Sequence, residues 1–151
     1  MRSDCFDNGY DSEYSLLVEY LQRVDSTFPD SLSNRTSLQN YACKLLDKAN
    51  IFSVKVDNTI VGLVAGYIDN RIGQQSFISV VSVLPDYQGM GLSKVLLNCY
   101  LKYADRQDVS EVFLYVYKSN YRAINLYEGL GFVMCETTDR PDYLKYIKRL
   151  R

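Results

Sequence analysis

The sequence predicts a mixed α+β domain, in which a mostly antiparallel sheet holds one parallel strand pair and is flanked by about four helices. Apolar residues recur first at helical and then at strand spacing, in the order α-α-β-β-β-α-β-α-β-β. A strand, a helix and a further strand between residues 77 and 118 require a parallel crossover inside an otherwise antiparallel sheet. The 151 residues fit one domain over residues 1–151.

Two helices are expected first. One begins near Asp11 and ends at Phe28-Pro29-Asp30, and its apolar face is Leu17, Tyr20, Leu21 and Val24. Thr36-Ser-Leu-Gln39 fits a capping box and opens the second helix. The apolar face of that helix comprises Leu38, Tyr41, Ala42, Leu45, Leu46 and Ala49.

The apolar period changes to that of strands after Asn50. Residues 51–56 and 59–69 form a hairpin around Asp57-Asn58, and residues 77–84 form a third strand. A helix from Gly91 to about Arg106 follows, with an apolar stripe of Leu92, Leu96, Cys99 and Tyr103. Cys99 is therefore expected to be a small core residue. The remaining elements are a strand at 112–118, a helix at 120–130, and closing strands at 132–136 and 143–148.

Composition narrows the function classes. The net charge is −1 and no basic stripe is present, so a nucleic-acid partner is not expected. The longest apolar run, residues 60–68, is too short to span a bilayer, and the N-terminus lacks a signal-peptide core. We therefore expect no membrane partner and a cytoplasmic location. The chain contains no histidine, which excludes Ser-His-Asp and Cys-His nucleophiles, and with no Cys-x-x-Cys pair we expect no metal site.

The segment from Val83 to Ser93 joins the third strand to the next helix through a turn that contains Gly89 and Gly91. Backbone N–H groups at such a turn, together with the helix dipole, form an anion site that glycines leave approachable. A dinucleotide fingerprint needs a third glycine where Lys94 stands, and no Gly-Lys-Ser/Thr completes a P-loop. The open alternatives are a different phosphate ligand or a tight turn without any ligand.

A second motif begins just after the strand at 112–118. Asn120, Ala123, Tyr127 and Leu130 are spaced by three, seven and ten residues, so they share one helix face. Asn120 and Tyr127 lie about 10 Å apart along that face. Taken alone, Tyr127 fits an ordinary core tyrosine.

Together, the two segments resemble the GCN5-related N-acetyltransferase (GNAT) family. Its acetyl-CoA signature, Gln/Arg-x-x-Gly-x-Gly/Ala, stands here as Gln88-Gly-Met-Gly91-Leu-Ser93, with Ser93 at the last position. Its second signature stands here as Asn120, Ala123, Leu126, Tyr127, Gly131 and Phe132. The order of elements also matches, although the family's first strand has no clear counterpart except residues near Phe6.

The resemblance implies a sheet whose parallel strands splay and acetyl-CoA as cofactor. Backbone N–H groups of the turn would hold the pyrophosphate, from Gln88, Gly89, Met90, Gly91, Leu92 and Ser93. The strand segment Val81, Ser82 and Val83 would pair with the pantetheine arm, and the Val83 N–H would polarise the thioester carbonyl. Asn120 would bond the pantetheine or phosphate region, and Ala123 would leave room for the cofactor. Tyr127 would act as the general acid that protonates the departing CoA thiolate.

Residues 77–83 contain no carboxylate to accept the proton of the amine, at a place where many members of the family have a glutamate. Ser79 and Ser82 would hold a water, and further candidates from neighbouring elements are Asp69, Tyr67, Asp25 and Glu19. The preferred hypothesis is that a water relays the proton of the amine, or that the amine arrives in its neutral form.

The implied function is acetyl-CoA-dependent transfer of an acetyl group to a primary amine of a small molecule, in a ternary complex. The acceptor would lie against residues 22–35 and 139–143, which contribute Phe28, Asp30, Arg35, Asp139 and Asp142. Alternatives are a non-catalytic acyl-CoA-binding module, a peptide or protein N-acetyltransferase, or a longer acyl chain or an oxygen acceptor. A monomer or a homodimer is expected.

Overall fold

One six-stranded sheet, in the order β1-β2-β3-β4-β6-β5, runs through the protein. The structure is a computed structural model that describes residues 11–69, 74–135 and 139–151, so the expectation for residues near Phe6 lies outside the described residues. The helices are α2 (Asp11–Asp25), α3 (Leu38–Lys48), α4 (Leu92–Arg106) and α5 (Tyr121–Gly129). The strands are β1 (Asn50–Val56), β2 (Thr59–Asp69), β3 (Gln75–Val83), β4 (Glu111–Tyr117), β5 (Val133–Met134) and β6 (Tyr143–Arg149).

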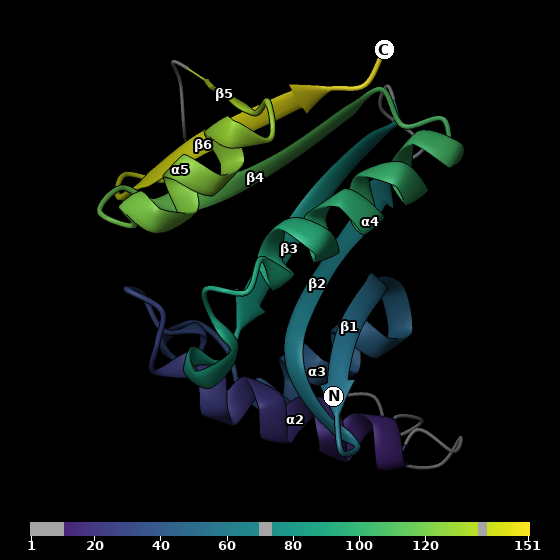
Figure 1. Cartoon of the computed structure of the whole chain (residues 1–151), viewed down its shortest axis with the longest axis vertical. Coiled ribbons are helices and arrows are strands. Elements are labelled where there is room, and N and C mark those ends of the chain that lie inside the picture. The colour runs from purple at the N-terminus through teal and green to yellow at the C-terminus, as the bar shows by residue number, and fades with distance from the viewer. Residues whose placement is uncertain (1–10, 70–73, 136–138) are drawn as a thin grey trace.

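The sheet consists of two antiparallel halves that are joined by one short parallel contact. β1, β2 and β3 pair in the first half, and β4, β6 and β5 in the second. Between the halves, only residues 75–78 of β3 pair with residues 111–114 of β4. Beyond these residues the strands separate, and Figure 1 shows the two halves diverging from this contact. The predicted mixed sheet with one parallel pair is confirmed.

Helices cover both faces of the sheet. α4 packs against β2 and β3, and it shares an apolar cluster with α5 and β4 that contains Tyr100, Leu114 and Tyr127. α2 and α3 share a second cluster with β2 and β3 on the other face, to which the predicted apolar face of α2 contributes fully. Each cluster therefore buries the apolar faces of two amphipathic helices.

Two local predictions were wrong. Cys99 is exposed, because the buried stripe of α4 is Leu96, Leu97, Tyr100, Leu101 and Ala104. The predicted stripe and the observed stripe both have helical spacing, and the observed one packs on the sheet with Tyr100 over Gly66. A Cβ atom at Gly66 would meet the Tyr100 ring and lie 2.8 Å from the Phe77 carbonyl oxygen. The N-cap of α3 is Ser37 rather than Thr36, and its side chain accepts from the Asn40 N–H.

β3, which borders the gap where β3 and β4 separate, contains a β-bulge at Ser79. Ala65 pairs with Val80 while Gly66 pairs with Ile78, so Ser79 is the extra residue. Three serines of β3 bond tyrosines from three different helices at 2.6 Å: Ser76 with Tyr100, Ser79 with Tyr41, and Ser82 with Tyr20. These bonds attach α4, α3 and α2 to the strand and fix its position.

Within the described residues, no helix has the length and apolar character needed to cross a membrane.

Candidate functional site

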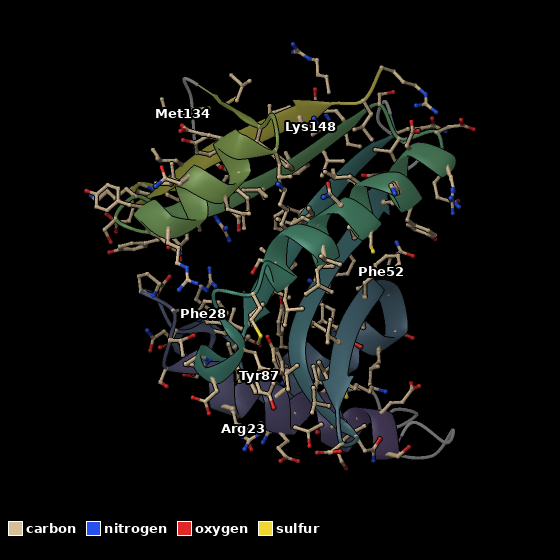
Figure 2. The ribbon with its side chains drawn as sticks, viewed as in Figure 1. Arg23, Phe28, Phe52, Tyr87, Met134 and Lys148 are labelled. Atoms are coloured by element: carbon tan, nitrogen blue, oxygen red, sulfur yellow. The ribbon has the colours of Figure 1, made fainter. Side chains whose placement is uncertain are left out.

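A cavity of about 520 Å³ opens where β3 and β4 separate. Its walls come from the end of β3, the turn before α4 and the start of that helix, one face of α5, and the loop after α2. Figure 2 shows Phe28 and Tyr87, which both line the cavity, on the side where the two halves of the sheet diverge. Segments that are far apart in sequence therefore meet at the interruption of the sheet.

The β3 wall presents backbone groups to the cavity. The Leu84 N–H donates to the Val61 carbonyl of β2 at 2.9 Å, so by the alternation of an extended strand the polar groups of Val83 and Val81 point away from β2 and into the gap. The Val83 carbonyl accepts from the Gln88 side-chain amide at 3.0 Å. The Val83 N–H and both polar groups of Val81 face the gap, as a strand edge does before another strand is added.

The glycine turn forms the second wall. Gly89 and Gly91 have φ of 85° and 79°, values that L side chains adopt at a cost, and a Cβ atom on either would meet nothing within 4 Å. Gly91 is the N-cap of α4, and the first intrahelical bond runs from the Val95 N–H to the Gly91 carbonyl at 3.1 Å. The preceding N–H groups have no acceptor inside the helix, so they and the helix dipole favour an anion at this point.

The charges that line this cavity are those of Lys94 and Arg122, and none of its lining residues is acidic. Arg122 donates to the Gln88 side-chain oxygen at 2.5 Å, while the same amide donates to Val83. This bridge joins α5, the glycine turn and β3. The sequence patterns did not predict Arg122 or Lys94; the only sequence signal is that Arg122 lies inside the second motif and that Lys94 directly follows the first.

α5 supplies the third wall. Asn120 is its N-cap, and the side-chain oxygen accepts from the Ala123 N–H at 3.3 Å, which leaves the amide nitrogen for a ligand. Tyr127 is buried and its ring packs on Phe132, with ring centroids 5.9 Å apart. Burial raises the pKa of the Tyr127 hydroxyl, so this group stays protonated at neutral pH. Among the described residues, none bonds to that hydroxyl.

Nearly all of the residues predicted to bind the cofactor line this one cavity: Val81, Ser82, Val83, Gln88, Gly89, Gly91, Leu92, Ser93, Asn120, Ala123 and Tyr127. Met90 is not among them, and its side chain is 60% exposed. Since the role predicted for Met90 uses its backbone N–H, the direction of its side chain does not affect that prediction.

The four residues from neighbouring elements that were considered as proton acceptors do not line either cavity at the gap between β3 and β4. Asp25 accepts from the Ser33 N–H and hydroxyl at 3.2 and 2.6 Å, which fixes the loop after α2. Glu19 is exposed on α2, and neither Asp69 nor Tyr67 lines a cavity at the gap. The two serines do reach it: Ser82 lines the large cavity, and Ser79 lines a smaller one beside it.

This smaller cavity, of about 130 Å³, shares part of its wall with the larger one, at Phe28, Val81, Asn120, Ala123 and Tyr127. Asp30 and Arg35, two of the residues predicted to face the acceptor, line it as well. Asp139 and Asp142 do not line it. Asp139 accepts from the Tyr115 hydroxyl at 3.1 Å, and Asp142 pairs with Lys118 at 3.2 Å.

Comparison with known proteins gives a family match and curated relatives. Residues 14–132 match the family described as Acetyltransferase (GNAT) family. The mycothiol acetyltransferase of Streptomyces coelicolor is 32% identical over 109 residues, which are 71% of this chain and 34% of that protein. The mycothiol acetyltransferase of Stackebrandtia nassauensis is 37% identical over 99 residues, which are 63% of this chain and 30% of that protein. The chain thus spans about a third of the length of these curated relatives.

Solved structures with the same fold extend over nearly the whole chain. A GNAT-family acetyltransferase of Staphylococcus aureus superposes with a TM-score of 0.74 at 18% identity, over 93% of this chain and 94% of that one. The PaiA N-acetyltransferase of Thermoplasma acidophilum, solved in complex with coenzyme A, has a TM-score of 0.70 at 17% identity, over 91% and 92%. The ribosomal-protein-S18-alanine N-acetyltransferase of Escherichia coli has a TM-score of 0.68 at 23% identity, over 92% and 86%. At these identities the likeness concerns the fold, and it agrees with the predicted splayed sheet.

Proposed function

This chain belongs to the acetyltransferase (GNAT) family, whose members use acetyl-CoA, and on that basis we propose that it transfers the acetyl group of acetyl-CoA to a primary amine of a small molecule. The observation that carries the proposal is the gap between β3 and β4, because two cavities meet there across a shared wall. The donor enters from the larger cavity and the acceptor from the smaller one, so both bind at once. That arrangement supports direct transfer in a ternary complex.

The residues of the large cavity take the roles that the family resemblance implies. Backbone N–H groups at the start of α4 hold the CoA pyrophosphate, and Lys94 and Arg122 add positive charge. The pantetheine arm adds to the open edge of β3 at Val81 and Val83. The amide nitrogen of Asn120 is available to the pantetheine arm, and the small side chain of Ala123 leaves room for the arm beside α5.

The chemistry needs few groups. The amine nitrogen attacks the thioester carbon while the Val83 N–H stabilises the negative charge that develops on the carbonyl oxygen. The carbon–sulfur bond then breaks, and the leaving sulfur takes the proton of the Tyr127 hydroxyl. The surplus proton of the amine passes to a water held at Ser79, since no acidic residue lines the donor cavity.

Two observations support a small acceptor. The smaller cavity encloses about 130 Å³, well below the several hundred Å³ typical of drug-sized ligands. The curated relatives are named for mycothiol, which is itself a small molecule.

The test combines binding with turnover. Calorimetry measures acetyl-CoA affinity, and a thiol-release assay measures turnover against a panel of small primary amines and short peptides. Binding together with amine-dependent thiol release is the expected result. Binding without release above background hydrolysis would indicate an acyl-CoA-binding module, and release with peptides alone would indicate a peptide N-acetyltransferase.

A further inference from the structure

The smaller cavity has charged side chains that the reaction itself does not use. Arg35, Arg140 and Asp30 line it, together with the Tyr115 and Tyr143 rings. A cavity of about 130 Å³ suits a small acceptor rather than a large ligand.

Two guanidinium groups lie against one aromatic ring in this cavity. The Arg35 guanidinium carbon lies 5.9 Å from the centre of the Tyr143 ring, and that of Arg140 lies 5.2 Å from it and 4.5 Å from the centre of the Tyr115 ring. Arg35 is exposed, and among the described residues no carboxylate forms an ion pair with it. The planar donors of Arg35 are therefore open to an oxygen anion that enters the cavity.

The lining carboxylate is already engaged. Asp30 accepts a short hydrogen bond from the Tyr143 hydroxyl and a longer one, at 3.5 Å, from the Asn34 amide. The Tyr143 bond, with the nearby arginines, holds the pKa of the Asp30 carboxyl below its ordinary value, so this group is a poor base at neutral pH. Asp30 instead fixes the ring against which Arg35 and Arg140 lie, so it is a positioning residue.

From this arrangement we propose that the acceptor carries an anionic oxygen group, a carboxylate at this size, beside its primary amine, and that Arg35 binds that group. The amine then points to the wall shared with the donor cavity, at Val81 and Tyr127. The inference rests on the proposed function and deepens it, since it names the acceptor as a small amino acid or a similar zwitterion. Arg140 adds positive charge on the same ring.

The experiment uses matched pairs of acceptors: amino acids with their carboxamides, which keep the amine and remove the negative charge. The wild-type protein is expected to show a higher kcat/KM for the acids. Arg35→Gln is expected to lower kcat/KM for the acids by about 10- to 100-fold, mainly through KM, and to leave the carboxamides nearly unchanged. Arg35→Lys keeps the charge without the planar fork and should restore part of the preference. Arg106→Gln makes the same charge change on an exposed residue at the end of α4 and serves as the control.

Equal wild-type rates for acids and carboxamides would overturn the inference, as would an equal loss for both in Arg35→Gln. Turnover restricted to peptide N-termini would also overturn it, although amine acetylation would stand. Failure of the proposed function is a different result: no thiol release with any amine from a protein that retains its circular dichroism spectrum.

Discussion

Tyr127 sits at the point where both cavities meet, and its environment matches the role of a general acid. Its side chain is 6% exposed, its ring rests on Phe132, and burial raises the pKa of its hydroxyl. A group that must donate a proton at neutral pH needs a pKa above that pH, and the ordinary tyrosine pKa of about 10 already satisfies this. Burial adds a fixed position, which is the larger benefit for proton transfer to a departing sulfur.

Tyr127→Phe should lower kcat at neutral pH by about 100-fold, the lower end of the range for a positioned acid, since a thiolate leaves readily even without one. Acetyl-CoA affinity should change little, because the ring remains. Steady-state kinetics from pH 6 to 10 and calorimetry measure the two effects. The exposed Tyr121 of the same helix provides the matched control, Tyr121→Phe. Turnover that is unchanged across this pH range would remove Tyr127 from the acid role.

Tyr143 and Asp30 form a hydrogen-bonded pair whose pKa values are coupled. The hydrogen bond to Tyr143 lowers the pKa of Asp30, and burial together with this bond raises the pKa of Tyr143 to about 12. A carboxyl whose folded pKa is depressed stabilises the fold above its unfolded pKa, and this contribution is lost as the pH falls through the folded pKa.

Tyr143→Phe should therefore raise the pKa of Asp30 toward its ordinary value, as measured by NMR titration of the side-chain carboxyl. The difference in unfolding free energy between wild type and variant should be present at pH 6 and shrink as the pH falls below about 4. In an Asp30→Asn background the hydroxyl should have a smaller effect on stability, which a double-mutant cycle measures. A pKa of Asp30 that does not move would contradict this coupling.

Among the elements, the junction of β3 and α4 shows how a short turn makes a binding site. Gly89 and Gly91 both take positive φ, and Gly91 caps α4 with its backbone rather than with a side chain. The open N–H groups of the first helical turn then face the cavity beside Lys94. The two glycines therefore have two effects at this turn: they allow its positive φ angles, and they leave its backbone N–H groups uncovered.

Gly91→Glu should abolish CoA binding, because it places bulk and negative charge where the pyrophosphate would lie. Gly91→Ala is the matched control: it carries the same backbone strain, about 1–2 kcal/mol, without the charge. A Cβ atom at this position meets no other atom within 4 Å, so both variants should fold. Calorimetry with CoA distinguishes them, and full binding by Gly91→Glu would refute the assignment of the turn.

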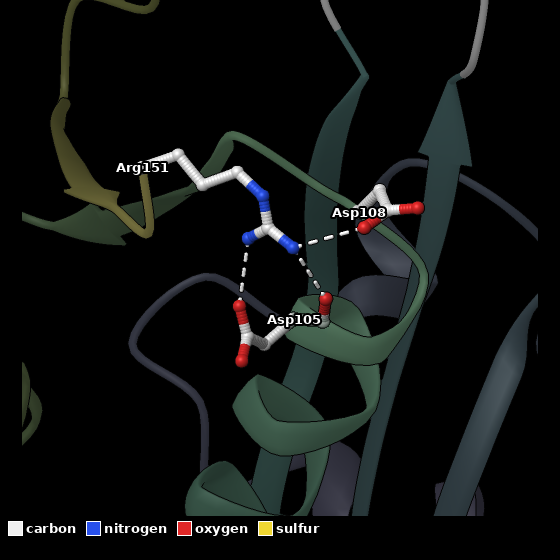
Figure 3. A network of polar contacts seen from close by, with 3 residues as sticks. All are labelled: Asp105, Asp108 and Arg151. Atoms are coloured by element: carbon white, nitrogen blue, oxygen red, sulfur yellow. Dashed lines mark hydrogen bonds and ion pairs between the residues drawn. The ribbon is translucent and has the colours of Figure 1, made fainter.

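Over the whole molecule, the sheet is closed at one end and open at the other. At the closed end Gln75 donates to Glu111 at 3.1 Å, and Glu111 pairs with Arg149 at 3.6 Å. Arg151 reaches back to the end of α4, where it contacts Asp105 at 2.7 Å and Asp108 at 3.0 Å (Figure 3). These contacts tie the second half of the sheet to α4, while the opposite end keeps the gap that holds the site.

Arg151→Ala should lower the thermal midpoint modestly and speed amide exchange near the end of β6, since these ion pairs are solvent-exposed. The difference from wild type should diminish in high salt, which screens exposed charges. Differential scanning calorimetry at two salt concentrations checks this, with Arg106→Ala as the control for loss of a surface charge. A salt-independent difference would show that packing, not charge, holds this end.

Most helix and strand bounds were predictable because they depend on local features. The hairpin turn at Asp57-Asn58 and the extents of α4 and α5 follow from residue type and spacing. The buried face of α4 was not predictable, because two overlapping stripes satisfy the same period and only docking on β2 and β3 selects between them. Arg122 was missed for a related reason: its partner Gln88 lies 34 residues away on another element.

By itself, the sequence determined the order of the elements, the glycine turn and the helix that carries Asn120 and Tyr127, since each depends on short-range periodicity and backbone preference. The tertiary structure alone decided that β3 and β4 separate after residues 78 and 114, and so where the two cavities meet. It also decided that Asp30 lies against Tyr143, 113 residues later in the chain. Contacts of that kind depend on strand order and on the divergence of the sheet, and no local pattern encodes either.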